Sequence, residues 1–228
     1  MLNIIFIAPP AAGKGTQSKL ISDEYNIPHI STGDLLRDEI AKGSKLGEVI
    51  SKTIKSGGLV SDEVITKLLK KKLTEKECKK GFILDGYPRN KEQAIIYNDL
   101  LKELNIDLGK VIFLDIDKDL AMTRTLSRLM CGKCGSSYNL LVNDLKPKKE
   151  GICDRCGAAL KIREDDNEET FLKRFDTYMN STKDLLDYYQ DLGVLSTIKI
   201  NKEDSAEVVF NNIKEILKKW LLLNQIMK

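Results

Sequence analysis

The stretch Phe6–Gln17 constrains the fold of this chain more than any other. It starts at the end of an apolar run, Leu2–Ile7, and passes through small residues to Gly13–Thr16, where a helix is predicted to open. Backbone N–H groups converge at such a helix start, the helix dipole favours negative charge, and Lys14 adds a full positive charge. The stretch therefore predicts a phosphate-binding loop, although Ala8 replaces the first glycine of the general G-x-x-x-x-G-K-[ST] pattern.

The rest of the chain alternates between short apolar runs and longer amphipathic stretches. The apolar runs predict five strands, over residues 2–7, 28–30, 82–85, 111–115 and 194–200. Helices are predicted over residues 16–25, 35–42, 45–55, 62–73, 91–104, 119–130, 165–189 and 205–223. Strands that alternate with helices indicate a parallel sheet with helices on both faces. The predicted fold class is α/β, a five-stranded parallel sheet of the P-loop NTPase type with a small inserted ribbon.

Composition narrows the setting of this fold. The chain has 228 residues, of which 42% are hydrophobic and 31% charged, which suits one compact unit with a small insertion. A net charge of +3 is too small by itself to imply a nucleic-acid partner. The first residues lack the basic start of a signal peptide, and no apolar run reaches membrane-spanning length. We therefore expect a cytoplasmic monomer with no nucleic-acid or membrane partner.

Four of the five cysteines form two C-x-x-C pairs. Cys131 and Cys134 are separated by 18 residues from Cys153 and Cys156, which fits the C-x₂-C-x₁₅₋₂₀-C-x₂-C pattern of a tetrahedral zinc site. Paired cysteines of this kind indicate metal binding in a reducing compartment, not disulfides. Because all four ligands come from the protein, the zinc is expected to be structural. The pattern leaves iron open as an alternative.

An acidic residue and several arginines stand at the predicted ends of elements. Asp85 ends the strand over 82–85, as Lys14 follows the first strand, so both are expected to face one crevice. Such a carboxylate typically organises Mg²⁺ near nucleotide phosphates, although it can also cap a turn. Arginine forks match phosphate oxygens, although a single arginine is often only a surface charge. Six arginines lie at or near element ends: Arg37, Arg89, Arg124, Arg128, Arg163 and Arg174.

With these features assembled, the chain resembles the adenylate kinases, specifically their long-lid, zinc-containing bacterial type. The resemblance spans essentially the whole chain. It is carried by 10–17, by Ser31-Thr-Gly-Asp-Leu-Leu-Arg37, by 82–89, by the four cysteines and by Arg163-Glu-Asp-Asp-Asn-Glu-Glu-Thr170. It implies a core formed by residues 1–30, 61–127 and 165–228, a monophosphate-binding segment over 31–60 and a zinc-binding lid over 128–164.

The resemblance also implies a reaction, the reversible Mg²⁺-dependent transfer of a phosphoryl group from ATP to AMP, which gives two ADP. The implied ATP-binding residues are Ala11, Ala12, Gly13, Lys14, Gly15, Thr16, Arg124 and Arg128. The implied AMP-binding residues are Thr32, Arg37, Gly58, Val60, Gly86, Arg89, Gln93, Arg163 and Arg174. The implied catalytic residues are Lys14, Asp85, Arg89, Arg128, Arg163 and Arg174.

Within these sets the resemblance gives some residues finer roles. Gln93 is implied to contact the adenine edge of AMP, Asp85 to order Mg²⁺ through water, and Asp165 to hold the closed lid. The family usually has glycine where Ala8 and Ala11 stand, so the two alanines are expected to strain the loop or crowd the phosphates, with activity retained and ATP binding weakened. Packing, not chemistry, is the expected role of the side chain of His29.

Two rival functions stay open at this point. A nucleoside monophosphate kinase with another acceptor, such as UMP, CMP or GMP, would have the same mechanism, although Gln93 and the region of Thr32 favour AMP. A weakly active nucleotide-binding protein whose ribbon binds nucleic acid would need aromatic residues there, and the ribbon has only Tyr138.

Overall fold

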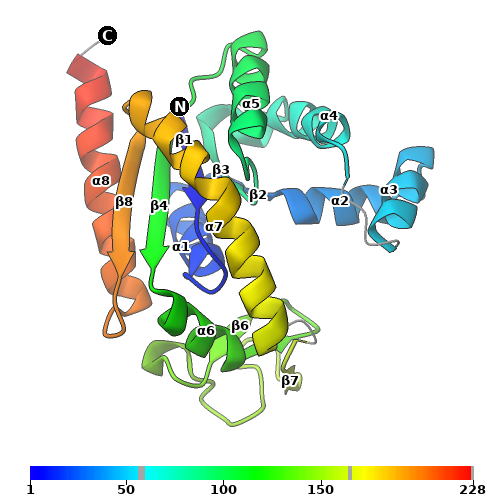
Figure 1. Ribbon diagram of the computed structural model, residues 1–228, viewed down its shortest axis with the longest axis vertical. Coiled ribbons are helices and arrows are strands. Elements are labelled where there is room, and N and C mark those ends of the chain that lie inside the picture. Colours follow the sequence, from blue (N-terminus) through cyan, green and yellow to red (C-terminus); the bar gives the residue numbers. More distant parts are fainter. Residues whose placement is uncertain (56–59, 164–165, 227–228) are drawn as a thin grey trace.

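A five-stranded parallel sheet forms the centre of the computed structural model, which describes residues 1–55, 60–163 and 166–226 (Figure 1). The strands run in the order β2-β3-β1-β4-β8. Their bounds are β1 Leu2–Ile7, β2 His29–Ser31, β3 Gly81–Asp85, β4 Lys110–Ile116 and β8 Leu195–Ile200. The predicted fold class is confirmed.

Helices cover both faces of the sheet. They are α1 Lys14–Tyr25, α2 Thr32–Ala41, α3 Lys45–Lys55, α4 Asp62–Leu73, α5 Lys91–Glu103, α6 Lys118–Leu126, α7 Glu168–Asp191 and α8 Ala206–Ile226. Two short 3₁₀ turns add to them, η1 Lys76–Lys80 and η2 Asn143–Leu145. None of the helices in the described part of the chain has the length and apolar character needed to span a membrane.

The strand β1 shows why the sheet is buried on both sides. Ile4 and Phe6 belong to one core cluster, which includes residues of α1 and α8. Ile5 and Ile7 alternate with them and belong to a second cluster, with residues of α4, α5 and the end of α7. Because side chains alternate across a strand, the continuous apolar run over residues 4–7 packs into two cores at once.

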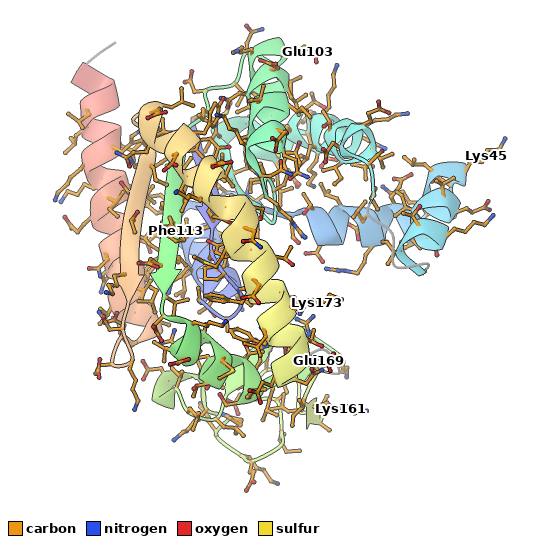
Figure 2. The ribbon with its side chains drawn as sticks, in the orientation of Figure 1. Lys45, Glu103, Phe113, Lys161, Glu169 and Lys173 are labelled. Atoms are coloured by element: carbon orange, nitrogen blue, oxygen red, sulfur yellow. The ribbon has the colours of Figure 1, made fainter. Side chains whose placement is uncertain are left out.

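Helices α2 and α3 project sideways from this core (Figure 1). They cross very closely, since a Cβ atom on Gly47 would lie 2.3 Å from the carbonyl oxygen of Glu39. Ser44 joins the two helices: its hydroxyl donates to Glu39 Oε1 at 2.6 Å and accepts from the N–H of Gly47 at 2.9 Å. Figure 2 places Lys45, at the start of α3, far from Lys173 on α7.

The prediction of one helix over 119–130 is wrong. Helix α6 ends at Leu126, and strand β5, Arg128–Cys131, begins two residues later. The reason is a distant side chain: Asn139 donates from Nδ2 to the carbonyl oxygen of Arg124 at 2.8 Å, and its Oδ1 accepts from the Ser127 hydroxyl at 3.1 Å. These bonds satisfy the end of α6 from another strand, so the local apolar pattern cannot reveal where the helix ends.

Strand β5 starts a second, smaller sheet. It pairs antiparallel with β6, Ser137–Asn139, and with β7, Leu160–Lys161. This ribbon lies at the lower end of the molecule in Figure 1, below the carboxyl end of β4. Its own apolar cluster is small and has three buried members, Cys131, Tyr138 and Cys153. The ribbon therefore has little core with which to hold itself together.

Candidate active site

The loop after β1 is built to bind an anion. Gly13 caps α1 with φ +90°, which the absent side chain permits. A Cβ atom on Gly13 or Gly15 would meet nothing within 4 Å, so the backbone there is open to a ligand. The first turn of α1 contains no acidic residue to neutralise the positive end of the helix dipole. A phosphate group fits this helix start in charge and in space.

Only one of the two unusual alanines has a strained backbone. Ala11 has φ +60°, in the left-handed region that favours glycine, whereas Ala8 is not among the described residues with positive φ. The expected strain is thus present at Ala11 and absent at Ala8, and the expected crowding of the phosphates stays a prediction for both. Helix α1 is nevertheless fixed in place, because Gln17 Nε2 donates to the carbonyl oxygen of Ala206 at 2.9 Å.

Lys14 and Asp85 form an ion pair at the carboxyl ends of neighbouring strands. Lys14 Nζ lies 2.7 Å from Asp85 Oδ1, and the Asp85 side chain is only 14% exposed. His29 Nε2 lies 3.2 Å from Asp85 Oδ2. Burial alone would raise the pKa of Asp85, but His29 and Lys14 outweigh burial and hold that pKa below its usual value. The expectation that His29 only packs is wrong, because its side chain is partly exposed and its ring contacts the central carboxylate.

A cleft of about 1400 Å³ runs from this loop to the ribbon. Most of the predicted nucleotide-binding and catalytic residues line it together, whereas Asp85, which pairs with Lys14, is not itself part of the lining. Those that line it are Ala11, Ala12, Gly13, Lys14, Gly15, Thr16, Gly86, Arg89, Arg124, Arg128, Arg163 and Arg174. Lys173, which Figure 2 labels on α7, also lines it. These five arginines, together with Arg155, make a strongly positive environment around one cavity.

Two of these arginines are held by contacts around the start of the ribbon. Arg128 forms a two-pronged pair with Asp166, in which Nε donates to Oδ2 at 2.7 Å and an NH2 nitrogen donates to Oδ1. The Asp166 side chain is fully buried, so the pair is largely desolvated. Arg124 donates to the carbonyl oxygen of Asn201 at 3.3 Å, and burial lowers the pKa of its guanidinium.

The residues predicted to bind AMP gather beside one end of this cleft. Thr32 donates from Oγ1 to the carbonyl oxygen of Gly86 at 3.3 Å, and Arg89 Nε donates to the same oxygen at 2.9 Å. Gln93 accepts at Oε1 from the N–H of Arg89 at 2.8 Å. Arg37, on α2, is exposed and pairs with Asp34.

Several residues predicted to bind AMP lie outside the cleft or outside the described part of the chain. Thr32, Arg37, Val60 and Gln93 do not line the cleft itself. Val60 is half-buried just before α4. Gly58 and Asp165 lie outside the described residues, and so do their predicted roles.

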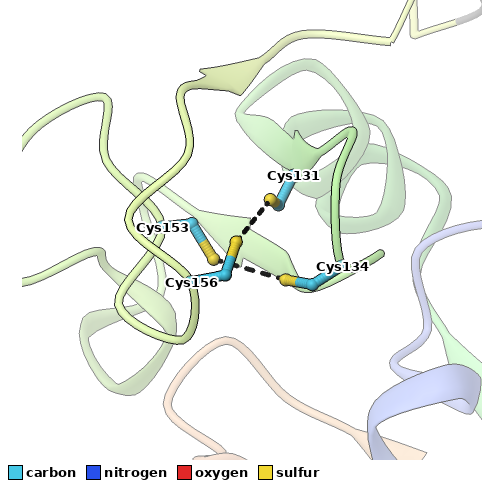
Figure 3. Close-up of side chains that lie close together, drawn as sticks. All are labelled: Cys131, Cys134, Cys153 and Cys156. Atoms are coloured by element: carbon cyan, nitrogen blue, oxygen red, sulfur yellow. Dashed lines mark hydrogen bonds between the residues drawn. The ribbon is translucent and has the colours of Figure 1, made fainter.

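The four predicted metal ligands come together in the ribbon (Figure 3). Their Sγ atoms all lie within 4.8 Å of one another. The Sγ atoms of Cys131 and Cys156 are 3.4 Å apart, and those of Cys134 and Cys153 are 3.5 Å apart. Tetrahedral zinc with bonds of about 2.3 Å separates its sulfur ligands by roughly 3.8 Å. Four thiolates at this spacing fit a structural zinc ion.

The two cysteine pairs adopt the same local turn. In each, the residue after the second cysteine is a glycine with φ +71°, Gly135 or Gly157. Each glycine N–H donates to the carbonyl oxygen of the first cysteine of its pair, at 3.0 Å and 2.9 Å. Tyr138 supports the cluster, since its hydroxyl contacts Cys153 Sγ at 3.4 Å, and this contact, with backbone N–H groups of Arg155 and Cys156, lowers the pKa of that thiol to about 6. Ligands with such outer contacts are already oriented for a metal.

Comparison with known proteins agrees with this geometry. The family model described as adenylate kinase matches residues 6–194. The chain belongs to the adenylate kinase family. Among its relatives is the adenylate kinase of Fervidobacterium nodosum, 42% identical over 212 residues, which are 92% of this chain and 96% of that protein. The adenylate kinase of Archaeoglobus fulgidus is 42% identical over 218 residues, 96% and 99% of the two chains, and that of Clostridium tetani is 41% identical over 216 residues, 95% and 98%.

Three contacts that involve aspartate side chains were not predicted from the sequence of this chain. They are the contact of His29 with Asp85, the pairing of Asp166 with Arg128, and a hydrogen bond from Gln93 Nε2 to Asp62 Oδ1 at 2.8 Å. Asp166 adjoins the predicted lid residue Asp165, so its neighbourhood was indicated. Asp62 gave no such signal. An aspartate in the first turn of a helix is common because it interacts favourably with the helix dipole, so it does not by itself indicate a further contact.

The left-handed backbone of Ala11 leads to a prediction with opposite signs at two alanines. We expect Ala11→Gly to raise the free energy of unfolding by about 0.5–1 kcal/mol, because relief of about 1–2 kcal/mol of strain exceeds the entropy cost of glycine. Ala8→Gly relieves no backbone strain and has only the entropy cost of glycine, so it should lower the free energy of unfolding. Urea unfolding of both variants measures the difference, and a loss of stability in Ala11→Gly contradicts the strain.

The low pKa of Asp85 predicts how the ion pair depends on pH. A carboxyl with a folded-state pKa below its ordinary value of about 3.9 contributes its stability above that value and loses it as pH falls toward the folded-state pKa. The free energy of unfolding should therefore be higher for the wild type than for Asp85→Asn at about pH 5, and the difference should shrink below about pH 4.

The matched control for this prediction is Asp99→Asn, which removes the partner of Lys102 in an exposed ion pair. Exposed pairs contribute little, so its curve should follow the wild type across the same range. Denaturant unfolding at several pH values measures both variants. A difference for Asp85→Asn that does not change with pH contradicts the assignment.

The cysteine cluster predicts one tightly bound zinc ion per chain. Cys156→Ala should abolish this metal content and lower the unfolding temperature, because the small ribbon relies on the metal to close it. Cys78→Ala is the control, since Cys78 lies outside the cluster and donates from Sγ to the carbonyl oxygen of Lys72 at 3.3 Å. Elemental analysis of the purified proteins reads out the result. Metal retained by Cys156→Ala would contradict the site.

Proposed function

We propose that this chain is an adenylate kinase that transfers the terminal phosphoryl group of ATP to AMP and runs equally in reverse from two ADP. The observation that carries the proposal is one cleft lined by Lys14, which pairs with Asp85, and by five of the predicted arginines. Phosphoryl transfer needs little covalent help from a protein. It needs its reactants held in line and its negative charge neutralised, and this cleft is suited to both.

In this proposal ATP occupies the loop end of the cleft. Backbone N–H groups at the start of α1 and the ammonium of Lys14 hold its β- and γ-phosphates. Arg124 lies against the ATP base. Arg128, Arg163 and Arg174 neutralise the charge on the phosphoryl group as it moves between donor and acceptor. Loss of any one of these cations weakens the transition state more than the bound substrates.

The acceptor AMP occupies the region between α2 and α5. Thr32, Arg37 and Arg89 bind its phosphate and sugar side, and Gln93 contacts the edge of its adenine. Gly58 and Val60 belong to the same proposed pocket by their place in the chain. No general base is required, because an oxygen of the AMP phosphate is already ionised and can attack directly.

Two metals belong to the proposal. Asp85 would hold Mg²⁺ through its waters, and its low pKa keeps it ionised for that task. When bound with ATP, Mg²⁺ neutralises phosphate charge and helps to orient the phosphate chain. The four cysteines would hold zinc, which closes the ribbon and leaves no ligand position for substrate.

Three parts of the chain have separate tasks in this scheme. Residues 1–30, 61–127 and 165–228 form the core, residues 31–60 bind the monophosphate, and residues 128–164 close over ATP as a lid. The projection of α2 and α3 and the separate sheet of the ribbon support this division. Closure would bring the ribbon arginines to the phosphates and exclude water, which would otherwise hydrolyse ATP.

Phosphorus NMR tests the proposed reaction directly. The purified protein is incubated with Mg²⁺ and ATP, and separately supplied with AMP, UMP, CMP or GMP. ADP that forms with AMP, with little or none from the other acceptors, supports an adenylate kinase. Transfer to a different acceptor would keep the mechanism and overturn the substrate. Absence of transfer to every acceptor would overturn the activity and leave a nucleotide-binding protein.

The placement of Arg89 gives a sharper prediction. Its exposed side chain makes one neutral contact, to Gly86, so its removal should change the cleft without unfolding it. We expect Arg89→Ala to lower kcat by about 10²–10³-fold, the usual effect of losing one charge-stabilising group. Lys91→Ala is the control, because Lys91 is an exposed cation two residues away that does not line the cleft. Initial rates with saturating ATP and AMP measure both, and equal rates for the two variants contradict the assignment.

A further inference from the structure

The side-chain amide of Gln93 is held at both of its ends. Gln93 is the third residue of α5, and the N–H of Arg89 donates to its Oε1 at 2.8 Å. Its Nε2 donates to Oδ1 of Asp62 at 2.8 Å. Asp62 is the first residue of α4, where the helix dipole stabilises a negative charge. Asp62 belongs to α4, whereas Arg89 lies in the loop just before α5, and these two helices pack against each other.

These partners permit only one orientation of the amide. A backbone N–H can only donate, so it must face the amide oxygen, and a carboxylate can only accept, so it must face the amide nitrogen. A half-turn of the amide would place two acceptors together at Asp62 and two donors together at Arg89. Both hydrogen bonds would be lost at once, and one of them involves a full charge.

The fixed amide keeps one free donor and one free acceptor in a defined order. A glutamine amide offers two N–H donors and two acceptor lone pairs, and each partner takes one. Adenine presents an amine donor beside a ring-nitrogen acceptor, which can pair with an amide of one orientation. Hypoxanthine and guanine present a carbonyl acceptor beside a ring N–H donor, which is the reverse order. An amide that turns freely can serve both kinds of base, whereas a fixed amide serves one.

We infer that Asp62 is a positioning residue that fixes the Gln93 amide and thereby makes the acceptor site select adenine over 6-oxopurines. The inference rests on the proposed function, in which Gln93 contacts the acceptor base. Asp62 itself touches no substrate and acts only through Gln93. Because the sugar and phosphate of the acceptor are held elsewhere, the base cannot turn over to meet an amide of the wrong orientation.

The test compares AMP with IMP, which has nearly the same shape and the reversed edge. The ratio of kcat/KM for AMP to kcat/KM for IMP is measured for the wild type and for Asp62→Ala. We expect the ratio to fall about tenfold in the variant, through a higher KM for AMP and a relative gain of IMP, because one charge-assisted hydrogen bond is lost. The kcat with saturating AMP should stay near that of the wild type, which a general structural defect would not allow.

Two further variants separate positioning from other effects of the substitution. Asp62→Asn keeps an oxygen that accepts from Gln93, so it should retain most of the AMP affinity that Asp62→Ala loses. Glu63→Ala removes an equal charge from the same first turn of α4, at an exposed position, and should leave the ratio unchanged. The ratio is independent of the fraction of folded enzyme, since both acceptors are measured on one preparation.

The outcomes distinguish this inference from the function on which it rests. A wild type that phosphorylates AMP, together with an unchanged ratio in Asp62→Ala, overturns the positioning role and leaves the proposed function intact. An equal fall of the ratio in Glu63→Ala also overturns it, because helix charge would then explain the effect. A wild type with no transfer to AMP overturns the proposed function and the inference together.

Discussion

The ion pair between Lys14 and Asp85 depends on the order of the strands, and the rest of the site depends on that pair. Strands β1 and β3 are parallel neighbours in which Phe6 lies beside Asp85. The loop after β1 must therefore pass the carboxylate that ends β3. Desolvation of the two charges is offset only if they meet closely, which the fixed register provides. Any other strand order would leave a partly buried carboxylate without its cation.

The ribbon meets a different physical constraint. Its three buried apolar members cannot by themselves hold the segment from β5 to β7 in one shape, and short segments of this kind usually need a metal or another crosslink. The two cysteine turns supply that crosslink, because each presents two sulfur atoms from a tight loop. A ribbon closed in this way can hold Arg128 as part of a rigid unit. This rigidity fixes the position of the arginine charge and adds little to the stability of the core.

Sequence patterns predicted the sheet and most of the helices because the signals there are local. The buried run of β1 and the amphipathic stretch of α4 lie at the predicted residues. The predicted end of α6 was wrong because Asn139, which belongs to strand β6, caps the helix. The contact of His29 with Asp85 likewise joins residues 56 positions apart, and no local pattern reports such a meeting. The cysteine site was predictable for the opposite reason, since its spacing encodes its geometry.

Three carboxylates each orient a side chain of the candidate site in the same way, and none of them occupies all the hydrogen-bonding groups of its partner. Asp85 takes one of the three donors of Lys14, and in the described part of the chain Asp166 takes two of the five N–H donors of Arg128. Asp62 takes one of the two amide donors of Gln93. Each partner is thus oriented before any ligand arrives and still has hydrogen-bonding capacity to offer. Arg128 can therefore bind an anion while its desolvated pair with Asp166 stays intact. Groups that are oriented in advance need no rearrangement as charge develops, which is the condition under which electrostatic stabilisation is most effective.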